Sequence, residues 1–130
     1  IEVITEDNAG DPSAMVDTEQ MIQLITNLVK NSVDAVENRG KIKISLEDDD
    51  KSLILKVWDN GQGIDEEKKE KIFEPFYTTK ETGKGTGLGL ATAYGIVKMH
   101  RGKIKVSSNS NPASGDTWTE FRVSIPRVKE

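Results

Sequence analysis

The sequence predicts an α+β fold, a two-layer sandwich in which a mixed, mostly antiparallel sheet of about five strands is covered on one face by about three helices. The expected elements follow the order β, α, ββ, short α, loop, α, ββ, and in this order hairpins outnumber βαβ units. The chain has 130 residues, which is the length of one domain. Residues 1–130 are therefore expected to form a single domain.

The first half of the chain predicts a strand, a long helix and a hairpin. Residues 1–5 alternate as a short strand does, and a helix is expected from Asp17 to about Asn38, where Arg39-Gly40 would end it. Residues 41–46 alternate strictly, as a half-buried strand does, and residues 53–59 are expected to form the next strand after an acidic turn, so the two predict a hairpin.

The long helix carries two stripes. Its apolar stripe consists of Ile22, Ile25, Val29, Val33 and Val36, with Leu28 beside it. Its polar stripe consists of Gln20, Gln23, Asn27, Asn31 and Asp34. This pattern predicts a helix that packs through the apolar stripe.

The second half predicts two helices and a second strand pair. Residues 65–71 are expected to form a short charged helix, and residues 73–87 an irregular, mobile segment. A second helix is expected over 88–100, followed by strands over 103–107 and 119–125. There are no internal repeats.

Composition excludes several classes of function. With no cysteine, the chain has no disulfide scaffold, thiol nucleophile or Cys-ligated metal site. Its one histidine, His100, excludes a multi-histidine site within this chain. The net charge of −4 argues against nucleic acid as a partner, and no apolar run is long enough to span a membrane. The chain opens with Ile-Glu-Val-Ile, without an initiator methionine, so we expect a fragment of a longer protein.

Two segments of the first half could bind a ligand. Asn27 and Asn31 lie one helical turn apart, and amide oxygens suit Mg²⁺, although this spacing alone is more typical of a solvated helix face. Asp59 ends a strand and is followed by Gly61 and Gly63, which would allow a ligand to approach the backbone closely. Taken alone, this second segment is more typical of a turn.

A third segment, Gly83 to Leu90, places four alternating glycines directly before a helix. Free N–H groups at a helix start bind anions, and Lys80 and Lys84 add positive charge. The motifs of P-loop proteins, dinucleotide-binding domains and eukaryotic-type protein kinases are absent.

These segments in this order resemble the ATP-binding catalytic domain of two-component sensor histidine kinases, in the superfamily shared with gyrase and a heat-shock chaperone (the Bergerat fold). Residues 27–32 resemble its asparagine box, 59–64 the first glycine box, 73–76 the phenylalanine box and 85–90 the second glycine box. The Phe-Tyr-Thr-Thr-Lys run resembles the nitrogen-regulator branch.

The resemblance implies a site for ATP and Mg²⁺. It implies that Asn31 coordinates the metal with Asn27 nearby, that Asp59 accepts a hydrogen bond from the adenine amino group, and that residues 73–87 form a mobile ATP lid. The full set of nucleotide-binding residues expected is Asn27, Asn31, Asp34, Asp59, Gly61, Gly63, Ile64, Phe73, Phe76, Lys80, Lys84, Gly85, Thr86, Gly87, Leu88, Gly89 and Thr119.

The resemblance also implies a reaction and partners. ATP-hydrolysing members of the superfamily carry a glutamate base one turn before the magnesium asparagine, where this chain has Asn27, which cannot take a proton. Transfer of the γ-phosphoryl group to a histidine is therefore expected. His100 sits where a helix-terminal histidine stabilises a helix end, so the acceptor is expected on a separate dimerisation domain of the same parent protein. A cognate response regulator, a cytoplasmic location with a parent that is either membrane-anchored or free, and a monomeric isolated domain are also expected.

Three alternatives remain open: a superfamily ATPase, a serine/threonine kinase of the same fold, and a nucleotide-binding module without phosphotransfer. The sequence also departs from the family at Ser114–Thr119, where Trp118 replaces a small residue of the usual third glycine box. How that end of the site is closed is left open by the sequence.

Overall fold

The computed structural model describes residues 1–7, 18–36, 40–49, 51–75, 77 and 88–126. The elements are β1 (Glu2–Asp7), α1 (Thr18–Val36), β2 (Lys41–Asp48), β3 (Ser52–Asp59), η1 (Glu66–Lys68), α2 (Gly89–Met99), β4 (Lys103–Asn109), η2 (Pro112–Ser114) and β5 (Trp118–Pro126). Among these residues, no helix combines the length and apolar character needed to cross a bilayer.

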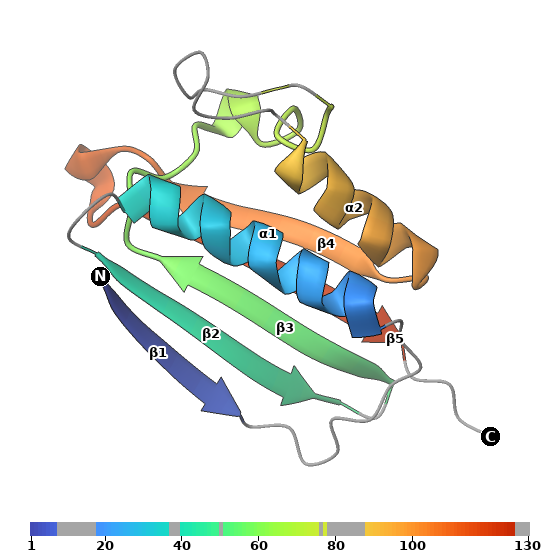
Figure 1. Cartoon of the computed structure of the whole chain (residues 1–130). Helices are drawn as coiled ribbons and strands as arrows, with labels where there is room; N and C mark the ends of the chain where they lie inside the picture. The colour runs from blue at the N-terminus through green and yellow to red at the C-terminus, as the bar shows by residue number, and fades with distance from the viewer. Residues whose placement is uncertain (8–17, 37–39, 50, 76, 78–87, 127–130) are drawn as a thin grey trace.

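The five strands form one sheet in the order β1-β2-β3-β5-β4 (Figure 1). β1 pairs with β2 in parallel, and the other three pairings are antiparallel. Helices α1 and α2 lie side by side on one face of this sheet. The α+β fold class and the mixed, mostly antiparallel sheet are thereby confirmed.

The prediction of about three helices was too high. The described part of the chain holds two α-helices, and the helix expected over 65–71 is a single 3-10 turn, Glu66–Lys68. None of the three residues of this turn is buried, so no apolar face ties it to the core. A helix this short is unstable without such packing, which explains why the charged pattern does not extend to a full helix.

The face through which α1 packs was predicted only in part: Val36 and Leu28 are buried as expected, and Val29 packs against the core. The fully buried residues of α1 are Leu24, Leu28 and Ser32, spaced four apart, with Val36 next in line. In contrast, Ile22, Ile25 and Val33 of the predicted stripe are 60%, 36% and 38% exposed. The buried row of α1 contains a polar residue, Ser32, whereas the neighbouring row of β-branched residues is apolar throughout. The sequence pattern therefore favoured the neighbouring row.

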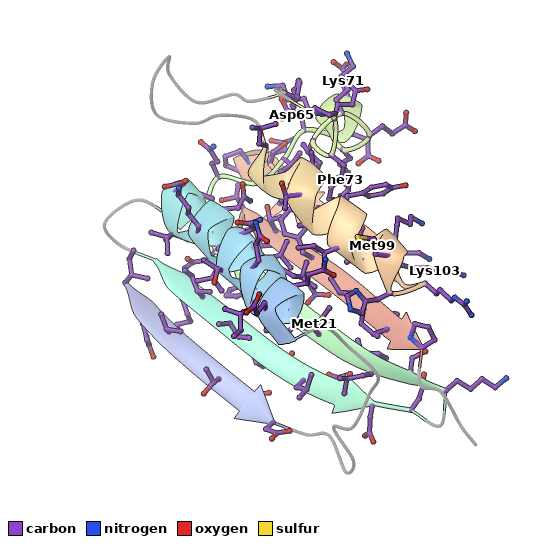
Figure 2. All side chains as sticks on the ribbon, turned by 45° about the vertical axis from the view of Figure 1, so that its right-hand side comes forward. Met21, Asp65, Lys71, Phe73, Met99 and Lys103 are labelled. Carbon is purple, nitrogen blue, oxygen red and sulfur yellow. The ribbon has the colours of Figure 1, made fainter. Side chains whose placement is uncertain are left out.

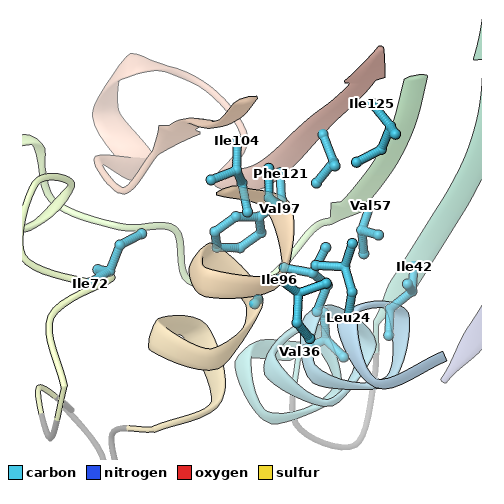
Figure 3. Packing of buried hydrophobic residues seen from close by; sticks show 13 residues of the cluster. Leu24, Val36, Ile42, Val57, Ile72, Ile96, Val97, Ile104, Phe121 and Ile125 are labelled. Carbon is cyan, nitrogen blue, oxygen red and sulfur yellow. The ribbon is translucent and has the colours of Figure 1, made fainter. Parts of the chain in front are cut away.

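The core lies between the helices and the sheet (Figure 3). Phe121 and Val123 of β5, Val57 of β3 and Val97 of α2 are fully buried there. On β5, Trp118, Glu120 and Arg122 alternate with the buried residues and so point to the opposite face. The sheet thus has a helix face, which holds the core, and an open face.

Helix α2 ends in a Schellman motif. The N–H of Gly102 donates to the carbonyl of Val97 (2.9 Å), and the N–H of Arg101 donates to that of Lys98 (3.0 Å). The left-handed position belongs to Arg101, with φ 58°, and not to the glycine. Gly102 is required for another reason, since a Cβ there would lie 2.4 Å from the carbonyl oxygen of Ser124.

Candidate functional site

Asp59 lies at the end of β3 on the helix face, and its side chain is fully buried. On the neighbouring strands it is paired with Ile42 and Thr119. Its Oδ1 accepts a hydrogen bond of 2.9 Å from the N–H of Gly61. Its Oδ2 is buried and has no hydrogen-bond partner among the described residues.

Burial dominates the electrostatics of this carboxyl group. Desolvation raises the pKa of Asp59 above its ordinary value, and the N–H of Gly61 and the hydroxyl of Ser32 oppose the rise. Ser32 on α1 is therefore close to the carboxyl group, but its Oγ, like Asp59 Oδ2, is buried without a hydrogen bond of good geometry in the described chain. A buried acceptor of this kind is stabilised when a donor arrives, and an exocyclic amino group of a purine is such a donor.

The two glycines after Asp59 approach the protein itself closely. A Cβ on Gly61 would lie 2.6 Å from the carbonyl oxygen of Ala35 on α1. Gly63 has φ 80°, and a Cβ there would lie 2.2 Å from the carbonyl oxygen of Asn109. These glycines therefore hold the loop against α1 and against the end of β4, and this packing fixes the position of Asp59.

Ser108 of β4 connects this loop to the last strand. Its Oγ accepts from the N–H of Ile64 (2.7 Å), lies 2.9 Å from Thr119 Oγ1, and donates to the carbonyl of Trp118 (2.7 Å). One hydroxyl can satisfy all three if Thr119 is the donor in the shared bond. Ser108 and Ser32 are the two residues of this region that the sequence prediction missed. For Ser32, the only signal in the sequence was its position four residues after Leu28, in the buried row of α1. No signal in the sequence pointed to Ser108.

Asn27 connects α1 to the start of α2. The Nδ2 of Asn27 donates to the carbonyl of Gly89 over 3.2 Å. This bond directs the donor end of the amide toward α2 and leaves Oδ1 available. Asn31, one turn along, is half-buried, and Asp34 is exposed.

The N-terminus of α2 is suited to an anion. Leu88 is its N-cap and provides no side-chain cap, so the first N–H groups of the helix lack an internal partner. A Cβ on Gly89 would have no atom of the described residues within 4 Å, so none of these residues blocks the approach of a ligand to the backbone there. A phosphate group fits both features.

Mg²⁺ is the ion that would accompany the expected nucleotide. The described residues could bind it through few protein ligands, with the nucleotide supplying the others. The described residues contain no group of three or more acidic or histidine ligands. Asn31 and Asn27 can offer amide oxygens, which are hard, neutral ligands. This set suits an ion held mainly by phosphate oxygens and water, with one or two protein ligands.

Phe73, the first residue of the expected lid, packs against the core. Its ring lies 5.5 Å from that of Tyr94 on α2 and 6.2 Å from that of Phe121, in an edge-on arrangement with the latter. Figure 2 shows it beside α2, below the segment that carries Asp65 and Lys71. A packing role for Phe73 follows from these contacts, and contact with a nucleotide remains a prediction.

The rest of the expected lid is only partly described. The expected site residues that lie outside the described residues are Phe76, Lys80, Lys84, Gly85, Thr86 and Gly87. Leu88, the residue that follows them, is 39% exposed. The roles expected for these residues therefore stay predictions.

Trp118 does not close the site. It precedes Thr119, which points to the helix face beside Asp59, so Trp118 points to the open face, where it lines a pocket with Trp58. His100 is the C-cap of α2, and its Nδ1 lies 2.8 Å from the carbonyl oxygen of Ile96. The position of His100 at the end of α2 agrees with the expectation that it stabilises the end of that helix.

Comparison with known proteins defines the class first. The model of the family described as histidine kinase-, DNA gyrase B- and HSP90-like ATPases matches residues 16–129. The chain belongs to this family.

Relatives then place the chain among the histidine kinases. It is 40% identical over 111 residues to sporulation kinase A of Bacillus subtilis (strain 168), and 42% identical over 104 residues to the signal transduction histidine-protein kinase AtoS of Escherichia coli (strain K12). These matches cover 85% and 79% of this chain but only 17% and 16% of the two relatives. The chain thus spans less than a fifth of the length of either kinase.

Solved structures agree with this placement. The catalytic domain of the histidine kinase ThkA matches with a TM-score of 0.83 and 36% identity, over 98% of this chain and 81% of that one. The resemblance to the histidine kinase catalytic domain is confirmed. A further structure, of ThkA in complex with the response regulator TrrA, matches with a TM-score of 0.72 and 29% identity, over 97% of this chain and 34% of that one.

Proposed function

We propose that this chain binds Mg-ATP and, as part of a longer kinase, donates the γ-phosphoryl group to a histidine on a separate dimerisation domain. The observation that carries the proposal is the buried Oδ2 of Asp59, which lacks a donor within the described chain. An adenine amino group would supply that donor, and the N–H groups at the start of α2, where the Leu88 side chain forms no cap, would donate to the phosphates.

In this proposal the residues of the chain position the nucleotide. Asp59 selects adenine, since guanine presents a carbonyl oxygen where adenine presents its amino group, and two acceptors would then face each other. Gly61 and Gly63 hold the loop that orients Asp59. The open approach to Gly89 lets the phosphate chain reach the N–H groups of α2. Mg²⁺, held by Asn31 with Asn27 nearby, would neutralise phosphate charge.

Transfer is favoured over hydrolysis because the site lacks a base to activate water. Asn27 occupies the position of the glutamate in hydrolysing relatives, and its amide is bonded to the carbonyl of Gly89 (3.2 Å). A neutral imidazole is already nucleophilic, so the acceptor histidine requires mainly alignment with the γ-phosphorus. His100 is not that acceptor, because its ring is engaged at the end of α2.

The partners follow from the same proposal. The acceptor domain belongs to the same parent protein, and a response regulator then receives the phosphoryl group, as the complex of ThkA with its response regulator suggests. We place the domain in the cytoplasm and expect it to be monomeric in isolation. An ATPase, a serine kinase and a binding module without transfer remain the competing functions.

Titration calorimetry of this chain with a non-hydrolysable ATP analogue, in Mg²⁺ and in EDTA, tests the nucleotide site. We expect binding by the wild type that is lost in Asp59→Asn and kept in Asp116→Asn, an exposed carboxylate used as the matched control. A folded wild type that binds no nucleotide would refute the proposal. Phosphotransfer itself is tested by restoring the dimerisation domain and recovering phosphohistidine, whereas phosphoserine would indicate the serine kinase.

A further inference from the structure

The open face of the sheet carries a pocket that the nucleotide site does not use. This tryptophan pocket, with a volume of about 900 Å³, is lined by Lys41, Trp58, Asn60, Asn109, Ser114, Asp116, Thr117 and Trp118. The chain contains only two tryptophans, and both line it. Each is partly exposed on a solvent face, where an apolar side chain of this size is unusual unless it meets a partner.

A row of cations crosses the same face further along the strands. Lys56 of β3 is paired with Arg122 of β5, and Arg122 is paired in turn with Lys105 of β4. These three residues form the basic row, in which like charges stand directly opposite each other. Such cross-strand pairs destabilise a sheet, so a counter-charge from outside would stabilise it.

Among the described residues of the open face, the lysines of β2 and β3 form ion pairs, whereas the cations of β4 and β5 do not. Lys43 forms an ion pair with Glu6 (3.1 Å), and Lys56 forms one with Glu47 (3.1 Å). Within the described chain, Arg122 and Lys105 have no ion pair. The open-face positions of β4 and β5 thus carry Lys103, Lys105 and Arg122 against the single carboxylate of Glu120, so this half of the face has a net positive charge in a chain whose net charge is −4.

We propose that the open face binds an acidic peptide segment of a partner protein, with an apolar side chain of that segment in the tryptophan pocket and its carboxylates against Arg122 and Lys105. The two features lie four residues apart along β5, from Trp118 to Arg122, which is about 13 Å for an extended strand. An extended ligand would thus need acidic residues about four positions from its apolar anchor. The acidic net charge of the chain disfavours nucleic acid as the occupant.

This inference goes beyond the proposed function, because the two sites lie on opposite faces of the sheet. Trp58 and Asp59 are consecutive residues, as are Trp118 and Thr119, and in each pair the first faces the open side. Peptide binding is therefore expected to persist in Asp59→Asn. That variant separates failure of one proposal from failure of the other.

The test uses the intrinsic fluorescence of the two tryptophans. The probe is a synthetic eleven-residue peptide without aromatic residues, acetyl-Gly-Leu-Ser-Gly-Ser-Asp-Glu-Asp-Glu-Ser-Gly-amide. We expect saturable binding that weakens with added salt. Replacing the leucine by serine, or the four acidic residues by lysine, is expected to abolish it.

The decisive comparison is between two double variants that each remove two positive charges. Lys105→Gln with Arg122→Gln removes the unpaired cations of the basic row and is expected to weaken binding by roughly two- to thirtyfold, since an exposed ion pair contributes little by itself. Lys43→Gln with Lys68→Gln removes two lysines outside the basic row, which are paired with Glu6 and Asp65, and is expected to leave binding within twofold. Circular dichroism and thermal melts verify that both variants fold.

Three results would overturn the inference. One is the absence of a saturable fluorescence change with the wild-type domain. Another is an equal loss of affinity in both double variants, which would show that the peptide responds to the net charge of the domain and not to Arg122 and Lys105. The third is tighter binding of a ten-nucleotide oligo-dT than of the peptide, which would identify the face as a nucleic-acid site.

Discussion

Replacing Asp59 by Asn is expected to change the affinity for nucleotide and the stability of the free domain in opposite directions. In the wild type, the N–H of Gly61 occupies Oδ1, and Oδ2 is the acceptor without a donor. The carbonyl oxygen of Asn would keep the Gly61 bond, and its NH₂ group would then take the place of Oδ2. A donor would therefore face the amino group of adenine, which is also a donor.

The expected loss of affinity follows from these two changes. A hydrogen bond to a charged acceptor contributes about 1.5–3 kcal/mol, and a buried donor left without a partner costs about 1–3 kcal/mol more. Together these amount to about 2.5–6 kcal/mol, which is roughly seventyfold to twenty-five-thousandfold in Kd. Calorimetry with ADP and with the ATP analogue measures this loss directly.

Stability of the free domain is expected to change in the opposite direction. Burial raises the pKa of Asp59, so the folded state binds a proton more readily than the unfolded state between the ordinary pKa and the raised one. The stability that this group contributes therefore falls as pH rises through that window, and its penalty is fully present once pH exceeds the raised pKa. Asp59→Asn removes the penalty and should make the nucleotide-free domain more stable than the wild type above that pKa.

Two measurements can refute this reasoning. Thermal melts of wild type and variant between pH 4 and pH 7 should converge toward acid pH, with the variant more stable at pH 7. A variant that is less stable at pH 7 would show that the carboxylate stabilises the fold instead. A variant that binds ADP as the wild type does would remove Asp59 from the adenine site.

Three further predictions concern backbone and metal. Gly61→Ala places a Cβ 2.6 Å from the carbonyl oxygen of Ala35 and should destabilise the fold by about 1–3 kcal/mol in chemical denaturation, whereas Gly89→Ala meets no atom within 4 Å and should leave stability unchanged or slightly higher. Asn31→Ala should abolish the dependence of nucleotide binding on Mg²⁺ in calorimetry, and a dependence equal to that of the wild type would exclude Asn31 as the ligand. Arg101→Gly relieves a residue at φ 58° and should raise the free energy of unfolding by about 0.5–1 kcal/mol, while a lower thermal midpoint would contradict the strain argument.

Much of the fold could be predicted because it depends on local patterns. Strict alternation over 41–46 and the mostly apolar run over 53–59 predicted β2 and β3, and Gly102 predicted where α2 ends. The packing face of α1 could be predicted only in part, because it depends on what lies opposite the helix. Ser32 faces a buried carboxylate, and no pattern within the helix itself indicates that a polar side chain belongs on the buried side.

The candidate site likewise contains residues that local motifs predicted and residues that they did not. Asp59, Asn27 and the start of α2 were found from motifs, and the structure brings them to the helix face. Ser108 was missed because its role is to connect Ile64, Trp118 and Thr119, which lie far apart in the sequence. A residue whose function is to join three segments has no local signature.

The strand register ties the two faces of the sheet together. At the end of β3 and at the start of β5, residues of the proposed nucleotide site alternate with residues of the tryptophan pocket, so that Asp59 and Thr119 are on the helix face and Trp58 and Trp118 are on the open face. A slip of one residue in either strand would exchange the two sets and bury a tryptophan in the proposed nucleotide site. Contacts made by Gly61 and by Ser108 at these strand ends oppose such a slip. The close packing of Gly61 therefore protects both sites at once, and Gly61→Ala should perturb nucleotide binding and tryptophan fluorescence together.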